Sequence, residues 1–341
     1  MSEYLRSKFK NLTPYTPGEQ LDDTEYIKLN TNESPFPPGI AKRYRLNRYS
    51  DHTCSLLRER LAELYDVSPE NIICGNGSDE ILYLAFNAFF EKAAFADVTY
   101  GFYKVFADGL GIEKKIIPLT RDYRIDPANY KGLDAGIAIA NPNAQTGIAL
   151  TMSEIEEIVK NNPDNVVIVD EAYVDFGAES AVPLTEFYDN LLVVMTFSKS
   201  RSLAGARLGF AIGNAGLIND LNTLRYSMNP YNVSTITQDL GVRAIEDNER
   251  YMENAGQIIE TRNYVCEMLD AIGYRYLPSS ANFLLITKDD IPGERIYTEL
   301  KEKGVLVRYF GDEERLKDYV RVTVGSRKQM LTFLDILEEI R

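Results

Sequence analysis

Residues 193–210 read VVMTFSKSRSLAGARLGF, an apolar run followed by small polar residues and a lysine, Lys199. The apolar run predicts a buried strand, which places Lys199 at the carboxyl end of that strand. In open α/β sheets this edge is where ligands bind. A partly desolvated amine at this position is able to form a Schiff base with an aldehyde. The alternative, which applies to most lysines, is a surface side chain with its head group in water.

The stretch VVIVDEAY at 166–173 predicts a second buried strand, which ends in two carboxylates and a tyrosine. Asp170 is able to pair there with a cationic ring nitrogen, and Tyr173 is able to reach a phenolic oxygen on the same ring. These are contacts that a pyridoxal ring requires. The alternative for the acidic pair is a magnesium site or the acidic first turn of a helix.

A third segment, GNGSDE at 75–80, opens a predicted helix. Unpaired backbone amides at a helix start, together with the Ser78 hydroxyl, form a cradle for a phosphate group. Arg207, eight residues after Lys199, supplies the cation that a phosphate dianion needs. On its own, this segment is equally compatible with a plain turn and a helix cap.

The order of apolar runs predicts the fold class. Short strand-like segments alternate with helical patterns, at 114–118, 136–140, 166–170, 191–196 and 208–212. This alternation favours an α/β fold with a mostly parallel sheet covered by helices on both faces. Long helical patterns at 235–246 and 249–272 are followed by strand-like segments at 281–286, 305–308 and 319–324 and by a helix from Arg327. We expect an N-terminal arm with part of a small domain over 1–50, a large cofactor-binding domain over 51–230, and connecting helices with a small α+β domain over 231–341.

Composition excludes several classes of protein. The 341 residues are 45% hydrophobic and 26% charged, as in globular proteins, and the net charge of −14 argues against nucleic acid as a partner. No apolar run approaches the roughly 20 residues of a membrane span. The single histidine, His52, cannot build a multi-histidine metal site, and no metal is expected. Three cysteines without a C-x-x-C pair favour a reducing compartment, so we expect a cytoplasmic protein.

In this order, the three segments resemble those of the fold-type I pyridoxal-phosphate aminotransferases, most closely the histidinol-phosphate branch of that family. The resemblance extends over nearly the whole chain, through PYTPG at 14–18, LNTNESP at 29–35, NRYSD at 47–51, TYGFY at 99–103, PYNVS at 230–234, SANF at 280–283 and VRVTVG at 320–325. It implies a homodimer with a shared active site and pyridoxal 5′-phosphate as cofactor. It also implies transfer of an amino group between histidinol phosphate and 2-oxoglutarate, which yields glutamate, in histidine biosynthesis.

The same resemblance implies roles for the cofactor-binding residues. Lys199 resembles the lysine that forms the Schiff base, Asp170 the partner of the pyridine nitrogen, and Tyr173 a ligand of the ring hydroxyl. Tyr100 resembles the aromatic residue that stacks on the ring. The positions that match the phosphate-binding group, with Asp79 beside them as a further cofactor-binding residue, are Gly77, Ser78, Thr196, Ser198 and Arg207.

Other residues are implied for the substrate and the second subunit. Arg308 and Arg321 match a pair that binds the anionic end of the substrate, since a guanidinium fork suits phosphate and carboxylate alike. Tyr15 on the arm is expected to close over this end, and Asn282 to lie near the substrate. Tyr49 matches a tyrosine donated across the dimer to the cofactor phosphate of the neighbouring subunit.

The chain departs from the family at one loop. Where many relatives read NPNNPTG, residues 141–147 read NPNAQTG, so Ala144 replaces an asparagine that contacts the ring hydroxyl and Gln145 replaces a proline. An alanine methyl cannot donate that hydrogen bond. Either Asn143 takes over the contact or Tyr173 makes it alone. Neither change touches Lys199, and we expect activity to survive.

Two other functions are compatible with the same sequence. An aromatic amino-acid aminotransferase or a decarboxylase of phosphorylated amino acids uses the same fold and cofactor, because function resides in the site. A ligand-binding regulator on the same scaffold needs an output module, and the sequence contains no basic helix-turn-helix segment.

Overall fold

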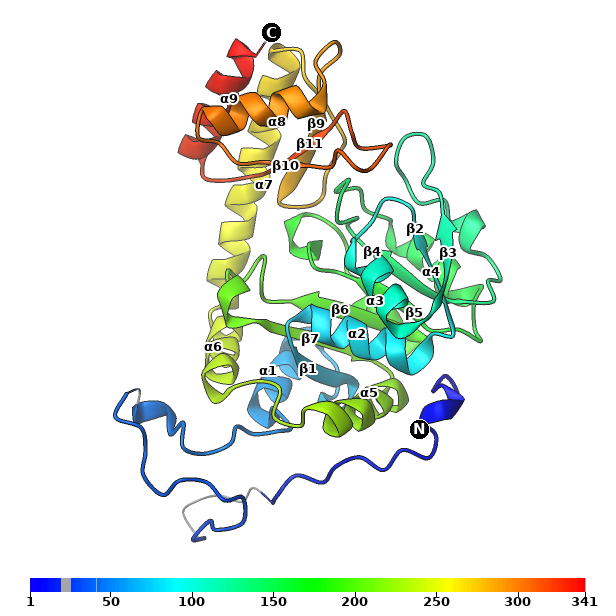
Figure 1. The fold of residues 1–341 in the computed structure, drawn as a ribbon, viewed down its shortest axis with the longest axis vertical. Coiled ribbons are helices and arrows are strands. Elements are labelled where there is room, and N and C mark those ends of the chain that lie inside the picture. Colours follow the sequence, from blue (N-terminus) through cyan, green and yellow to red (C-terminus); the bar gives the residue numbers. More distant parts are fainter. Residues whose placement is uncertain (20–25, 41, 341) are drawn as a thin grey trace.

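The computed structural model describes residues 1–19, 26–40 and 42–340, and its centre is a seven-stranded sheet (Figure 1). The strand order is β1-β7-β6-β5-β4-β2-β3. In this sheet the neighbouring strands are parallel, except that β7 runs antiparallel to both β1 and β6. The prediction of an α/β fold with a mostly parallel sheet is therefore confirmed. The strands are β1 (Ile72–Asn76), β2 (Lys92–Ala96), β3 (Glu113–Ile117), β4 (Gly136–Ala140), β5 (Val167–Asp170), β6 (Leu191–Thr196) and β7 (Leu208–Gly213).

Helices cover both faces of this sheet, because the central strands are apolar on both sides. Val169 and Ile168, neighbours on β5, illustrate this arrangement, since successive side chains of a strand point to opposite faces. Val169 belongs to the apolar cluster with α1 (Ser55–Tyr65), α4 (Met152–Lys160) and α6 (Thr235–Glu246). Ile168 belongs to the cluster with α2 (Ser78–Phe89), α3 (Phe102–Leu110) and α5 (Ala215–Met228).

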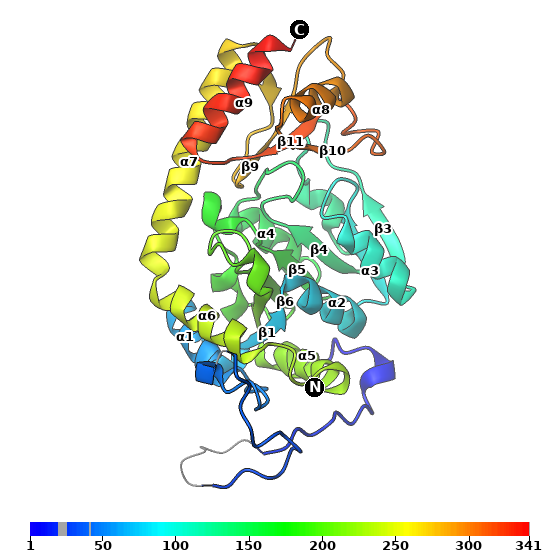
Figure 2. The same ribbon diagram turned by 60° about the vertical axis from the view of Figure 1, so that its left-hand side comes forward.

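A smaller, four-stranded antiparallel sheet lies at the other end of a long helix. The helix, α7 (Asn248–Ala271), starts beside α6, runs past the large sheet and reaches the small one (Figures 1 and 2). The small sheet has the order β10-β11-β9-β8 and shares an apolar cluster with α7. Its strands and helices are β8 (Arg275–Tyr276), β9 (Phe283–Thr287), α8 (Gly293–Glu302), β10 (Arg308–Tyr309), β11 (Val320–Thr323) and α9 (Arg327–Glu339).

The described residues of the N-terminal arm have almost no regular structure, as the prolines of the arm predict. Its start is tied to the end of α2, where the Arg6 amide donates to the Ala88 carbonyl at 2.9 Å. The described residues 10–19, 26–40 and 42–50 lie along the side of the molecule remote from the small sheet, and the last of them lead into α1 (Figure 2). Short 3-10 helices lie at Ser7–Phe9 and Lys42–Tyr44 in the arm and, further on, at Pro69–Asn71, Pro127–Tyr130, Val174–Phe176, Val182–Glu186 and Ala204–Ala206.

Among the helices described, none combines the length and the apolar character that crossing a bilayer requires.

Candidate active site

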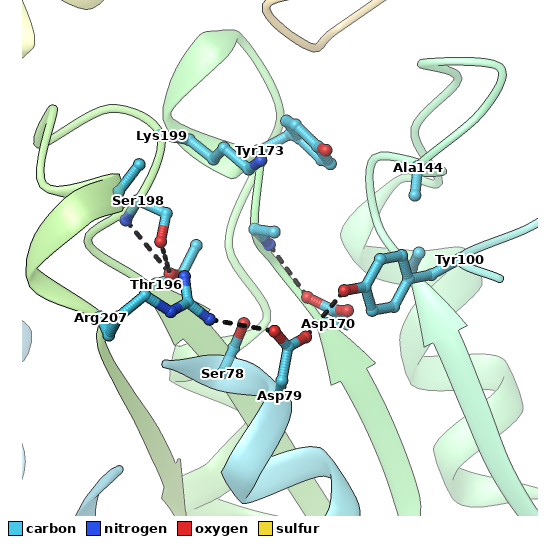
Figure 3. Close-up of a pocket in the computed structure, with 13 residues that line it drawn as sticks. Ser78, Asp79, Tyr100, Ala144, Asp170, Tyr173, Thr196, Ser198, Lys199 and Arg207 are labelled. Carbon is cyan, nitrogen blue, oxygen red and sulfur yellow. Dashed lines mark hydrogen bonds and ion pairs between the residues drawn. The ribbon is translucent and has the colours of Figure 1, made fainter. Parts of the chain in front are cut away.

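A pocket opens at the carboxyl edge of the large sheet, between the ends of β4, β5 and β6 and the start of α2 (Figure 3). Its volume is about 230 Å³. The structure brings nine of the residues predicted from the sequence into its lining: Ser78, Asp79, Tyr100, Asp170, Tyr173, Thr196, Ser198, Lys199 and Arg207. They come from segments far apart in the sequence, and they meet because parallel strands end at the same edge.

Asp170, the last residue of β5, is a buried carboxylate in the pocket, with only 5% of its surface exposed. The Tyr103 hydroxyl donates to its Oδ2 at 2.9 Å and the Ala172 amide to its Oδ1 at 3.2 Å. Burial raises the pKa of Asp170 to about 6, and these two hydrogen bonds oppose that rise. Both donors are neutral, so a positive charge placed beside this carboxylate stabilises its ionised form.

Arg207, Asp79 and Tyr100 form a hydrogen-bonded chain, which lies below Lys199 and Tyr173 in Figure 3. Arg207 Nη2 lies 3.1 Å from Asp79 Oδ2, and the Tyr100 hydroxyl donates to Asp79 Oδ1 at 2.7 Å. Burial and this bond raise the pKa of Tyr100, so its hydroxyl stays protonated. The chain fixes the Tyr100 ring against the pocket and holds a guanidinium near the start of α2.

Two glycines allow the backbone to approach closely at this corner. Gly77, directly before α2, has a φ of +78°, and a Cβ there would lie 2.6 Å from Arg207 Nη2. A Cβ at Gly209 would lie 2.3 Å from the Ser78 amide nitrogen. Only glycine suits both positions without displacement. The first-turn amides of α2, the Ser78 hydroxyl and Arg207 therefore converge on a small space that suits an anion.

Lys199 lines the pocket, with its Nζ 5.3 Å from the centre of the Tyr173 ring. That its amine is partly desolvated stays a prediction, since in the single chain the residue as a whole is exposed. It is exposed because the loop after β6 carries Lys199 beyond the strand. Beneath it, the Thr196 hydroxyl donates to Ser198 Oγ at 3.0 Å and accepts from the Ser198 amide at 3.1 Å.

In the loop at 141–147, whose sequence differs from that of the family, Asn143 does not line the pocket. Asn143 is buried, its Nδ2 donates to the Val98 carbonyl at 2.9 Å, and its Oδ1 accepts from the amides of Gln145 and Thr146. The prediction that Asn143 contacts the cofactor is not supported by its position, because Asn143 is not among the residues that line the pocket and its side chain is bonded to backbone groups of the loop and of Val98. The pocket is lined at this point by the Ala144 side chain.

The two arginines predicted for the substrate lie directly opposite each other on β10 and β11, at register positions Arg308 and Arg321. Both guanidinium groups lie 5.4 Å from the centre of the Phe310 ring, and that of Arg321 also lies 5.0 Å from Phe283. Phe283 in turn packs edge-on against Tyr173, 5.2 Å between ring centres. The pair is therefore connected to the pocket by one continuous set of ring contacts.

Asn282 precedes β9 in the same region, and its carbonyl accepts from the Val324 amide at 2.9 Å. This bond places the residue directly before Phe283, at the start of β9.

Tyr15 and Tyr49 are not brought to the pocket of their own chain. Both are exposed on the arm, and the Tyr49 ring stacks on Tyr231 with centres 4.4 Å apart. Glu33 fixes this part of the arm, since its carboxylate accepts from the Tyr49 amide, Lys28 and Arg48. Burial raises the pKa of Glu33, but these bonds outweigh it and lower the pKa to about 2.

Two features of the site were not predicted from the sequence. Tyr103 is fully buried and donates a hydrogen bond to Asp170; it belongs to the TYGFY segment, three residues after Tyr100. Phe310 and Phe283 enclose Arg321, and no local signal marks such a contact. Glu171, the second carboxylate of the acidic pair, does not line the pocket: its carboxylate accepts from the Ser180 hydroxyl and the Ala181 amide, and burial raises its pKa to about 8.

The pocket fits pyridoxal phosphate on three observations. A buried carboxylate with two neutral donors suits the ring nitrogen cation. The glycine-lined corner beside Arg207 suits the phosphate. An amine, Lys199, lines the same pocket, where an aldehyde would meet it.

Comparisons with known proteins agree with this chemistry. The family model described as aminotransferase class I and II matches residues 17–337. A histidinol-phosphate aminotransferase of Brachyspira hyodysenteriae is 47% identical over 100% of this chain and 99% of its own length, and one of a Marinomonas species is 45% identical over 100% of both.

Solved structures share the fold. The histidinol-phosphate aminotransferase from Clostridium acetobutylicum superposes with a TM-score of 0.81 at 24% identity, over 86% of this chain and 91% of that chain. The enzyme of that name from Sinorhizobium meliloti, solved in complex with pyridoxal-5′-phosphate, superposes with a TM-score of 0.79 at 22% identity, over 91% and 89%.

Proposed function

The chain belongs to the class I and II aminotransferase family, and we propose that it transfers an amino group between histidinol phosphate and 2-oxoglutarate with pyridoxal phosphate as cofactor. One observation carries the proposal: nine residues expected from separate sequence segments line a single pocket. The full-length similarity to histidinol-phosphate aminotransferases gives the substrate.

We propose that the following residues bind the cofactor. Asp170 pairs with the ring nitrogen and keeps a proton on it, because a buried carboxylate is stabilised by a cation. Tyr100 lies against the ring, held by Asp79. The start of α2 and Arg207 bind the phosphate. Tyr173 alone contacts the ring hydroxyl, since Ala144 lacks a donor and the amide of Asn143 is paired with backbone.

When bound, pyridoxal phosphate supplies an aldehyde that takes up the amino group and a ring that accepts the electron pair left on the substrate carbon. Lys199 provides the amine that holds the aldehyde before substrate arrives. It then takes the proton from the substrate carbon that bears the amino group and later returns it, as general base and acid. The Tyr173 ring, whose centre lies 5.3 Å from the amine, limits where the Lys199 side chain can lie.

Arg308 and Arg321 recognise the anionic end of the substrate. The two arginines lie opposite each other on β10 and β11, so they bring two positive charges to one place. The Glu313 carboxylate interacts electrostatically with both guanidinium groups. Phosphate and carboxylate accept the same fork of N–H donors, so one pair serves both histidinol phosphate and glutamate.

The enzyme works as a homodimer whose sites are completed by the arm of the partner. The arm exposes large apolar side chains, with exposures of 89% for Ile27, 86% for Leu29 and 79% for Phe36. Such a run of apolar surface is covered in a stable protein, and a second copy of the chain is its expected cover. In that dimer Tyr49 reaches the cofactor phosphate of the partner, and Tyr15 its substrate. We place this enzyme in the cytoplasm, where its three free cysteines stay reduced.

The test is a comparison of substrates. We expect the purified protein with pyridoxal phosphate to convert histidinol phosphate and 2-oxoglutarate far faster than phenylalanine and 2-oxoglutarate, and to release no carbon dioxide from threonine phosphate. Absence of turnover with histidinol phosphate, or faster turnover of either competitor, would contradict the proposal.

A further inference from the structure

Gln145 makes a contact that joins the two sheets of the molecule. Its Oε1 accepts a hydrogen bond from Arg321 Nη1 at 2.8 Å, and the neighbouring Ala144 carbonyl accepts from the same nitrogen at 2.6 Å. Gln145 is 7% exposed, and its bond to Arg321 is partly buried. Ala144 therefore lines the pocket and, together with the Gln145 side chain, binds Arg321, the arginine proposed to recognise the substrate.

The loop is rigid enough to direct Gln145. Asn143 Oδ1 accepts from the Gln145 amide at 2.9 Å and from the Thr146 amide at 3.1 Å, while its Nδ2 is bound to Val98. The Gly147 carbonyl accepts from the Ser280 amide at 2.8 Å, which ties the loop to the segment before β9. A Cβ at Gly147 would lie 2.2 Å from Ser279 Oγ, so the loop at 141–147 packs tightly against the segment before β9.

The two bonds decide which edge of the Arg321 guanidinium is presented. Nη1 carries two hydrogens, and Ala144 and Gln145 accept one each. Within the described residues, these are the hydrogen bonds that Arg321 makes through its side chain. The Nε and Nη2 hydrogens form the remaining edge, and two parallel N–H groups are what a carboxylate or phosphate accepts.

We infer that Gln145 is a positioning residue for substrate recognition: it holds Arg321 so that the Nε–Nη2 edge receives the anionic group of the substrate. The inference rests on the proposed role of Arg321. The Phe283 and Phe310 rings lie 5.0 and 5.4 Å from the guanidinium, and the bonds to Gln145 and Ala144 limit its rotation. Gln145 does not touch the reacting atoms, so its loss acts on binding rather than on the chemical step.

The test compares two variants with a matched control. Gln145→Leu removes the acceptor and keeps the bulk. Gln145→Glu keeps an acceptor oxygen but adds a negative charge that competes with the substrate anion. Gln257→Leu, at an exposed position on α7, is the control. The KM and kcat for histidinol phosphate and 2-oxoglutarate, the affinity for pyridoxal phosphate, and the calorimetric Kd of the holoprotein for the dicarboxylate maleate are measured.

We expect Gln145→Leu to raise the KM for both substrates and the maleate Kd about 5- to 20-fold, the effect of one hydrogen bond to a charged group, with kcat and cofactor affinity unchanged. Gln145→Glu should raise both constants further. Unchanged constants in both variants would overturn the inference, and so would a fall in cofactor affinity of the same size, which indicates a purely structural loop. If the wild type itself fails to turn over histidinol phosphate, the proposed function fails, and the maleate Kd values still decide the role of Gln145.

Discussion

The carboxyl edge of the large sheet and the N-terminal arm differ in how far a single chain completes them. At the edge, Asp170, Asp79 and Arg207 already have partners within the chain. On the arm, Glu33 organises the backbone, while Ile27 and Leu29 face outward. One subunit therefore supplies the residues that bind the cofactor. The residues that cover the site are expected from the arm of a second copy.

The largest effect should come from the edge. Lys199→Ala removes the amine that moves the proton, and we expect kcat to fall by about 10⁴-fold while the protein stays folded. The measurement is single-turnover transamination of histidinol phosphate, with Lys131→Ala at an exposed position as the control. Activity within tenfold of wild type would remove Lys199 from the chemistry.

Asp170→Asn should be next in size. The variant cannot stabilise the ring nitrogen cation, and loss of one partner of a buried charge pair costs about 2–5 kcal/mol. We expect cofactor affinity and rate together to fall by about 10²- to 10³-fold, measured by titration of the apoprotein with pyridoxal phosphate. Asp164→Asn, at an exposed position, should behave as wild type. If Asp170→Asn and Asp164→Asn bind pyridoxal phosphate with equal affinity, Asp170 does not pair with the ring nitrogen.

A smaller effect tests the arm. Tyr49→Phe removes one hydrogen bond to a charged phosphate, and we expect cofactor affinity to fall about tenfold. When this variant is mixed equally with Lys199→Ala, half of the dimers are mixed, and each has one intact site if Tyr49 acts across the dimer. At limiting cofactor, activity should then recover to about a quarter of wild type per chain. If Tyr49 acts within its own chain, no mixed dimer has an intact site. The activity should then equal only that of the Tyr49→Phe chains, which make up half of the mixture.

The smallest effect is a shift along the pH axis. Asp170 must be ionised to pair with a cation, so cofactor affinity should fall as the pH drops through about 6. The Tyr103 hydroxyl stabilises the ionised carboxylate, and Tyr103→Phe should therefore raise the pKa of Asp170 and move this fall to higher pH. Affinity measured against pH checks the shift, with Tyr130→Phe, a buried tyrosine on the opposite face, as the control. An identical profile for both variants would show that Tyr103 only fills space.

The sequence predicted the edge well for a physical reason. Lys199 and Asp170 follow apolar runs, and the carboxyl ends of parallel strands meet wherever those strands pair. Three strands were missed. β1 ends in a Gly-Asn pair, β2 reads KAAFA with alanines that favour helix, and β8 has two residues, so local propensity did not indicate them.

Contacts between distant segments were the least predictable part of the site. Gln145 and Arg321 are separated by 176 positions, and the pairing depends on how the small sheet packs on the large one. Asn143 was expected near the cofactor because its type suits the ring hydroxyl. The structure uses the same amide to fix the loop, since buried backbone groups also require partners.

The central claim, that Lys199 holds an aldehyde cofactor in this pocket, is tested most directly by reducing the holoprotein with borohydride and mapping the labelled peptide. We predict loss of the visible absorbance of the bound cofactor and a pyridoxyl group on Lys199, in the peptide that contains TFSKS. Label on any other lysine, or reduction without covalent label, would contradict the account.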